Sequence, residues 1–127
     1  MTEPEWLTLE IVMDAHAEQL AIFGGGDGIR DRGLLESALA RAPNKWAYGE
    51  ARLSALAAAY GYGLSRNHGF VDGNKRIAFA AILMFLGLNG VRFSPGKADA
   101  TVAMLALAAG EIDEDGLTQW IEDNIVV

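Results

Sequence analysis

The chain has 127 residues and a formal net charge of −7, from 10 Lys and Arg against 17 Asp and Glu. This negative charge argues against nucleic acid as the main partner, because phosphate contacts need a cationic face. The sequence has no cysteine, which excludes disulfides, thiol catalysis and the usual zinc ligand sets. The length predicts one domain, residues 1–127, large enough to bury about two thirds of its unfolded surface.

No signal peptide is recognisable, and no apolar run reaches the about 18 residues needed to span a bilayer. The apolar stretch from Ile77 to Leu88 is too short for that role. We therefore expect a cytoplasmic protein without a membrane partner.

A first helix is predicted from about Leu9 to Phe23, with Thr8 as its N-cap. The residues on its apolar face are Leu9, Val12, Met13, His16, Leu20 and Phe23. We interpret His16 as a packing residue, because no second titratable group lies immediately beside it. The run from Gly24 to Gly28 lacks the lysine and the preceding strand of a phosphate loop, so we interpret it as a turn.

Asp31 is the candidate cap of a second helix. The inward residues of this helix would be Leu34, Leu35, Ala38 and Leu39. Pro43 is expected to break the helical pattern. The following loop, Ala42 to Glu50, contains Trp46 and Tyr48, which would form either a lid beside a site or aromatic plugs in the core; we favour plugs.

A third helix is predicted from about Ala51 to Arg66. Its residues at helical spacing are Leu53, Leu56, Ala57, Tyr60 and Leu64. The sequence G-Y-G inside it, Gly61 to Gly63, costs about 1 kcal/mol per glycine relative to alanine. Either another helix approaches closely there, or the helix ends early to shape a site.

The remaining elements complete an all-α fold, a bundle of about six helices around the buried apolar helix from Ile77 to Leu88. That helix should end at L-N-G and be followed by a short extended piece, Val91 to Phe93. A helix from about Lys97 to Ala109 follows, with Val102, Leu105, Ala106 and Ala109 on one face. A last helix should begin at Asp113 and bury Leu117, Trp120 and Ile121.

The stretch from Arg66 to Arg76, R-N-H-G-F-V-D-G-N-K-R, joins two of these helices. It reads as a loop that becomes the start of the apolar helix, where unsatisfied N–H groups and partial positive charge favour an anion. Gly73 would let the backbone bend tightly there. Lys75 and Arg76 oppose the helix dipole at this end, and a bound phosphate would remove that conflict.

The candidate roles follow from the chemistry of the residue types. His68 is the candidate general base, because imidazole titrates near neutral pH, and Asp72 is the candidate Mg²⁺ ligand. The candidate groups for phosphate or ATP are the backbone amides of Gly73, Asn74 and Lys75, the side chains of Lys75 and Arg76, and Arg66. Phe70 is interpreted as an anchor that packs the loop against the core.

Each residue also has a purely structural interpretation. Asp72 could cap the following helix, Asn74 could bond its own turn, and His68 could be held by a backbone carbonyl. Arg66 could simply place a cation at the end of its helix.

The nine residues His68 to Arg76 resemble the signature H-x-F-x-D/N-A/G-N-K-R of the Doc (death-on-curing) branch of the Fic/Doc family. They are also similar to the Fic signature H-P-F-x-D/E-G-N-G-R-x-x-R, with two departures. Lys75 stands where Fic enzymes keep a glycine, and Phe79 stands where they keep a second arginine. Fic enzymes transfer AMP, whereas Doc proteins resemble a Fic site in which the γ-phosphate of a reversed nucleotide meets the base. Both departures favour phosphoryl transfer.

The resemblance implies a toxin of a type II toxin–antitoxin system, a kinase that uses ATP and Mg²⁺ to phosphorylate a protein threonine or serine. The implied target is elongation factor Tu, and the implied inhibitor is a Phd-like antitoxin that inserts a segment into a groove near the site. Residues Thr118 to Asp123 only approximate the internal inhibitory motif of many Fic proteins, so we expect inhibition in trans. The alternatives are a Fic-type AMP transferase and a catalytically silent antitoxin-binding module; a nucleotide hydrolase is a weaker choice because the motif has one carboxylate.

Overall fold

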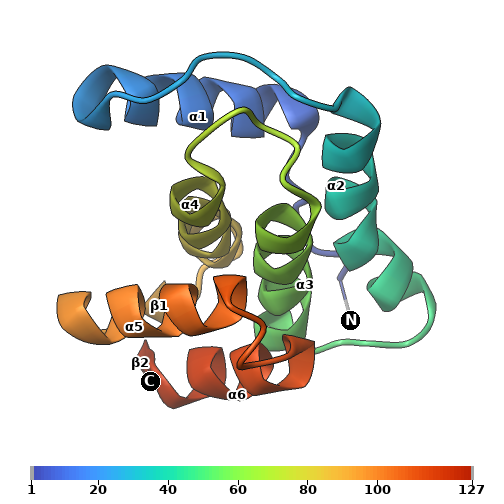
Figure 1. Ribbon diagram of the computed structural model, residues 1–127. Helices are drawn as coiled ribbons and strands as arrows, with labels where there is room; N and C mark the ends of the chain where they lie inside the picture. The colour runs from blue at the N-terminus through green and yellow to red at the C-terminus, as the bar shows by residue number, and fades with distance from the viewer. Residues whose placement is uncertain (1, 127) are drawn as a thin grey trace.

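The computed structural model describes residues 2–126, which form six helices and two short strands (Figure 1). The elements are α1 (Leu9–Phe23), α2 (Arg32–Ala47), α3 (Leu53–Asn67), α4 (Asn74–Leu88), β1 (Arg92–Phe93), α5 (Lys97–Ala108), α6 (Glu114–Asp123) and β2 (Ile125–Val126). This arrangement confirms the all-α fold expected from the sequence. Within residues 2–126, no helix has the length and apolar character needed to cross a membrane.

Helices α3 and α4 run side by side through the centre of the bundle, and the other helices surround them (Figure 1). Helix α2 packs along α3, α1 crosses one end of the pair, and α5 and α6 lie toward the other end. The strands β1 and β2 form an antiparallel pair, Arg92 opposite Val126 and Phe93 opposite Ile125. The sequence predicted the extended piece at β1 but not its partner β2.

The predicted N-caps are confirmed at both α1 and α2. The hydroxyl of Thr8 accepts a hydrogen bond from the amide of Ile11, and the carboxylate of Asp31 accepts one from the amide of Leu34. These short side chains satisfy amides that the first helical turn leaves without a partner. Both helices therefore begin where the local sequence indicates.

Helix α3 is the most completely buried helix, with 11 of its 15 residues buried. Close packing explains its glycines. A Cβ atom on Gly61 would lie 2.6 Å from Cδ1 of Ile82 on α4, and one on Gly63 would lie 3.1 Å from Cα of Ala38 on α2. Because the helix continues to Asn67, the alternative of an early end is wrong.

The expected break at Pro43 is wrong, because α2 continues through this residue to Ala47. A proline removes one intrahelical hydrogen bond, and tertiary packing offsets that loss here. Ala42 is fully buried, and the ring of Trp46 packs edge-on against Trp6 at 6.2 Å between centroids. Trp46 is thus an aromatic plug as expected.

Tyr48 does not form a plug, because 93% of the residue is exposed. It also makes a poor lid, because it precedes the start of α3 whereas the motif loop follows the end of that helix. A 15-residue helix separates the two positions by about 22 Å.

The apolar face predicted for α1 is correct only in part, and the face predicted for α5 is wrong. On α1, Met13 and Phe23 are exposed although Val12 and His16 are buried. On α5, Val102 and Leu105 are 65% and 52% exposed. The residues of α5 that pack inward are Ala100, Ala103, Met104 and Leu107. Since α5 is apolar around most of its circumference, periodicity could not select its buried side.

The close contact at Gly63 predicts that Gly63→Ala destabilises the fold. The added methyl group meets the backbone of α2, and such overpacking costs typically about 1–3 kcal/mol. The matched control is Gly87→Ala on α4, where a Cβ atom would have nothing within 4 Å. This control should be neutral or stabilising by up to about 1 kcal/mol, because alanine favours helix. Urea denaturation measures both, and a Gly63→Ala variant as stable as wild type would contradict the packing argument.

Candidate functional site

His68 is the residue at which α3 ends, and its backbone is left-handed, with φ 48° and ψ 50°. Among residues 2–126 it is the one non-glycine residue with positive φ. The guanidinium of Arg30 secures the turn by donating from Nε to the carbonyl of His68 at 2.6 Å and from Nη2 to that of Asn67 at 3.0 Å. The end of α3 is therefore capped by a side chain that the sequence had not singled out.

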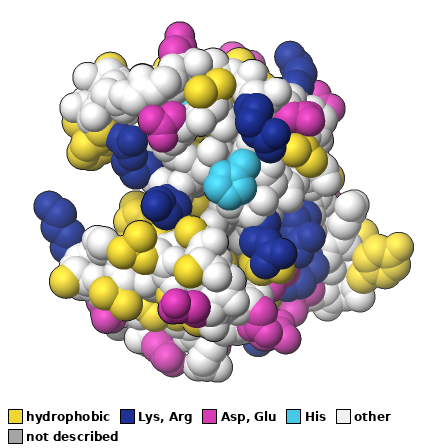
Figure 2. Space-filling model, viewed as in Figure 1, with side chains coloured by type: hydrophobic (Ala, Val, Ile, Leu, Met, Phe, Trp, Pro, Cys, Tyr) yellow, Lys and Arg dark blue, Asp and Glu magenta, His cyan; other side chains and the backbone are white. Residues whose placement is uncertain are grey.

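The His68 side chain is exposed and makes no hydrogen bond within the described residues. The structural alternative of an imidazole held by a carbonyl therefore has no support in this part of the chain. Figure 2 shows the exposed histidine on the surface with Lys and Arg side chains on several sides of it. A free imidazole in a cationic setting can accept a proton from an approaching hydroxyl.

The loop after His68 is anchored in the core. A Cβ atom on Gly69 would lie 2.4 Å from Cδ2 of Leu35, so only glycine fits there without a shift of Leu35. Phe70 is 2% exposed and stacks on His16, with ring centroids 3.7 Å apart and planes 7° from parallel. The structure thus places Phe70 where a loop anchor is expected.

The side chain of Asn74 bonds the loop to itself. Its Oδ1 accepts from the amide of Phe70 at 3.1 Å, and its Nδ2 donates to the carbonyl of Phe70 at 3.0 Å. The amide side chain is therefore used within the loop, as the structural alternative proposed, and only the backbone N–H of Asn74 remains as a candidate phosphate donor.

Asp72 is exposed, and its carboxylate accepts two backbone hydrogen bonds. Oδ1 accepts from the amide of Gly73 at 2.7 Å, and Oδ2 accepts from the amide of Gly26 at 3.2 Å. These two bonds, helped by the charge of Arg76, lower the pKa of Asp72 below its ordinary value. The group is therefore ionised at neutral pH.

The glycine-rich run takes part in the site, contrary to its interpretation as a simple turn. Besides the bond from Gly26, the carbonyl of Gly28 accepts from the amide of Val71 at 3.1 Å, and Ile29 forms an antiparallel bridge with Phe70. A Cβ atom on Gly25 would lie 2.8 Å from Oδ2 of Asp72. The glycines thus let two loops far apart in sequence lie against each other.

Helix α4 begins immediately after this loop. Gly73 is its N-cap in left-handed geometry, φ 79°, and within residues 2–126 no side chain caps the first turn. Lys75 is exposed, and the guanidinium carbon of Arg76 lies 5.2 Å from the ring centroid of Phe23. Open amides, the helix dipole and two cations therefore coincide at one helix start, which is suited to an anion.

The side chain of Arg66 packs on its own helix. Its guanidinium carbon is 5.4 Å from the ring centroid of Tyr62, one turn earlier on α3, and Arg41 of α2 lies 5.1 Å from the same ring. Within the described residues Arg66 forms no ion pair. The contact of Arg66 that the structure shows is therefore with Tyr62, and Arg66 does not line the cavity that Lys75 and Arg76 line.

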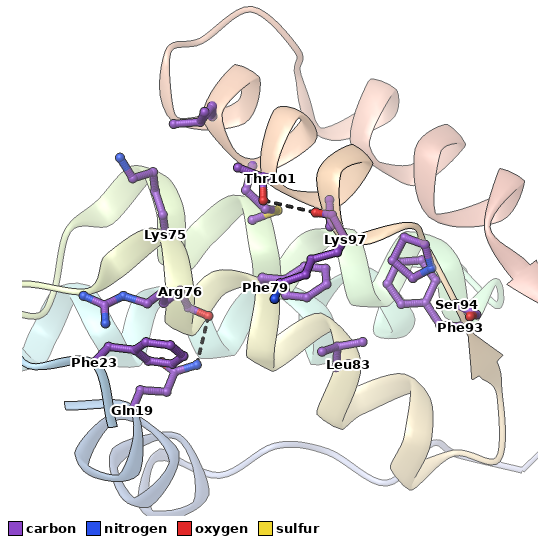
Figure 3. A pocket seen from close by; sticks show the side chains of 14 residues that line it. Gln19, Phe23, Lys75, Arg76, Phe79, Leu83, Phe93, Ser94, Lys97 and Thr101 are labelled. Carbon is purple, nitrogen blue, oxygen red and sulfur yellow. Dashed lines mark hydrogen bonds between the residues drawn. The ribbon is translucent and has the colours of Figure 1, made fainter. Parts of the chain in front are cut away.

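A cavity of about 710 Å³ opens between α4 and α5 (Figure 3). Lys75 and Arg76 line one part of it, together with Gln19 and Phe23 of α1. The remaining lining is largely apolar and comes from Phe79, Leu83, Phe93, Ser94, Pro95, Lys97, Ala100, Thr101, Met104 and Leu105. Lys75 and Arg76 therefore belong both to the start of α4 and to the groove, whereas His68 and Asp72 do not line the groove.

The donor set suits Mg²⁺ only with help from a ligand. No group of three His, Cys, Asp or Glu residues able to hold a metal occurs in residues 2–126. Asp72 alone supplies an ionised carboxylate, and each of its oxygens accepts one hydrogen bond and so keeps further acceptor capacity. Mg²⁺ is commonly held by one or two carboxylates plus substrate phosphates and water, and this site fits that mode.

The left-handed backbone at His68 predicts that His68→Gly is more stable than His68→Ala, by about 1 kcal/mol. A residue with a Cβ atom loses roughly 1–2 kcal/mol of stability in this conformation. Glycine avoids that strain, but its unfolded chain has more conformational entropy, which offsets part of the gain. Urea denaturation of the two variants measures the difference directly. Equal stability of the two would contradict the prediction, because the strain of the left-handed turn would then be no larger than the entropic cost of glycine.

Comparisons with known proteins agree with the motif. A sequence model of the Fic/DOC family matches residues 6–86, which include the loop from His68 to Arg76. The chain is 45% identical over 93 residues to Toxin Doc of Mycolicibacterium smegmatis, an alignment that covers 71% of this chain and 68% of that protein. It is 37% identical over 106 residues to Protein kinase doc of Escherichia phage P1, covering 81% and 82% respectively. The chain therefore belongs to the Fic/DOC family.

Proposed function

We propose that this protein is the toxin of a type II toxin–antitoxin system and transfers the γ-phosphate of ATP to a serine or threonine hydroxyl of a protein. The observation that carries the proposal is the exposed imidazole of His68, which has no hydrogen-bond partner within residues 2–126 and follows α3 six residues before the open, cationic start of α4. The names of the two relatives, Toxin Doc and Protein kinase doc, support the same activity.

The residues of the loop have separate tasks in this reaction. A ring nitrogen of His68 accepts the proton of the target hydroxyl while that oxygen attacks the γ-phosphorus and the bond to the β-phosphate oxygen breaks, leaving ADP. The backbone amides at the start of α4 and the side chains of Lys75 and Arg76 hold the phosphate oxygens. Each group acts by position and charge, which is the main requirement of phosphoryl transfer.

Asp72 would hold Mg²⁺ together with the nucleotide phosphates. Its lowered pKa keeps the carboxylate charged at neutral pH, as a hard metal ion requires. When bound, the metal neutralises part of the polyphosphate charge. The bonds from Gly26 and Gly73 fix the carboxylate before any ligand arrives.

Phe79 favours phosphoryl transfer over AMP transfer. It lies one turn after Lys75 on α4, lines the groove and packs against Phe93, with ring centroids 6.5 Å apart. An apolar ring at this place offers no charge to a phosphate, whereas the arginine of the similar Fic signature would. AMP transfer is therefore the second candidate, and a catalytically silent antitoxin-binding module is the third.

We propose the groove as the binding site of a Phd-like antitoxin. Its apolar walls suit the apolar side of an inserted segment, and Lys75 and Arg76 at one part of it suit acidic side chains. A segment bound there would lie against the phosphate-binding cations. Helix α6 offers no internal substitute, because Glu122, the glutamate of the approximate motif, accepts a hydrogen bond from Ser54 at the beginning of α3 and does not line the groove.

The sharpest test of the reaction uses ATP labelled at either the γ or the α position. With a translation extract as target source, we expect label to reach a protein of the size of elongation factor Tu from γ-labelled ATP only. His68→Gly should lower the transfer rate by about 10²- to 10⁴-fold, because the proton acceptor is gone. Gly87→Ala, a change remote from the site, should transfer at the wild-type rate. Label from α-labelled ATP alone would mean AMP transfer, and no label from either would favour the silent module.

The toxin role is tested in growing bacterial cells. Expression of the wild-type protein without an antitoxin should arrest growth, and His68→Gly expressed to the same level should not. Harmless expression of soluble wild-type protein would refute the role. Growth curves and immunoblots of the soluble fraction measure the outcome.

A further inference from the structure

The face of α1 that meets the motif loop carries two polar side chains, and both donate to the main chain around the start of α4. Nε2 of His16 lies 2.8 Å from the carbonyl oxygen of Asp72, and Nε2 of Gln19 donates to the carbonyl oxygen of Arg76 at 3.3 Å. The two donors are three residues apart on α1 and so lie on one face. The two acceptors lie four residues apart, one just before α4 and one in its first turn.

His16 is fixed in a single arrangement by its surroundings. It is 4% exposed, its ring stacks on Phe70, and a Cβ atom on Gly73 would lie 3.5 Å from its Nε2. A carbonyl oxygen only accepts hydrogen bonds, so Nε2 must carry the proton. This one ring therefore contacts the loop at its buried anchor, at the carbonyl of Asp72 and beside the left-handed Gly73.

We infer that His16 is a positioning residue, which as the Nε2–H form holds the Asp72–Gly73 peptide so that the carboxylate and the amides of α4 face one ligand. The inference rests on the proposed binding of Mg-ATP at this turn. Asp72 is exposed and within residues 2–126 its carboxylate is bonded only to the amides of Gly26 and Gly73, whereas the bond from His16 to its carbonyl comes from a buried side chain that is stacked on Phe70. Loss of such an outer hydrogen bond to a metal ligand typically weakens affinity by about 10- to 100-fold.

Two substitutions of His16 separate the contribution of its hydrogen-bond donor from that of its aromatic ring. His16→Phe keeps an aromatic ring against Phe70 but removes the donor, whereas His16→Gln places an amide Nε2–H at a similar reach but removes the ring. Val12→Ala is the control, because Val12 is fully buried on the same helix and lies outside the site. It should lower stability and leave the site intact.

The first readout is the dissociation constant of Mg-ATP, measured by calorimetry without protein target so that no turnover contributes. We expect about 10- to 100-fold weaker binding for His16→Phe, and binding within a few-fold of wild type for His16→Gln and Val12→Ala. Wild-type affinity in His16→Phe would overturn the inference, as would equal weakening in Val12→Ala.

The second readout needs no ligand. The amides of Phe70 and Val71 are hydrogen-bonded, to Asn74 and Gly28, and so report on the order of the loop. After correction for global stability, their hydrogen exchange should be faster in His16→Phe than in wild type or Val12→Ala. Nitrogen NMR of the wild-type imidazole should place the proton of His16 on Nε2.

These measurements distinguish a failure of the proposed function from a failure of the positioning role of His16. If wild-type protein binds no Mg-ATP, the proposed function fails, and the exchange rates and the imidazole form still decide whether His16 holds the loop. A proton on Nδ1, or unchanged exchange in His16→Phe, overturns the positioning role whatever the nucleotide result.

Discussion

The site depends on a reversal of the chain within six residues, between the end of α3 and the start of α4. Two left-handed residues produce it, His68 at the end of one helix and Gly73 at the start of the next. The first turns the imidazole-bearing residue out of the helix, and the second aims the opening turn of α4 back toward it. Every other contact of the loop keeps this reversal in place, chiefly the buried ring of Phe70.

The parts of the molecule that local sequence controls were predictable. The caps Thr8 and Asp31 bond amides three residues further along the chain, so a window of four residues is enough to predict them. The bend at Gly73 and the lack of an acidic cap on α4 are local features of the same kind. Because the motif is itself one continuous stretch, the candidate base, carboxylate and cations could be proposed together.

The parts that depend on distant packing were not predictable. Helix α2 continues through Pro43 because the core holds the residues around it. The bond from Gly26 to Asp72 and that from His16 to the same residue span 46 and 56 positions of the chain. No spacing rule in the sequence relates residues so far apart. The run of glycines from Gly24 to Gly28 indicates only that another segment can approach its backbone closely, not which segment does so.

The short strand pair gives the last residues of the described chain an influence on the groove. Phe93 of β1 lines it, and this ring is held from behind by Trp120 of α6 at 5.6 Å and by the pairing of β1 with β2. The amide of Ser94, also in the lining, donates to the carbonyl of Asn124. One wall of the groove is therefore supported from behind by residues 120–126, so that a change in this segment would reach the proposed antitoxin groove without touching the loop from His68 to Arg76.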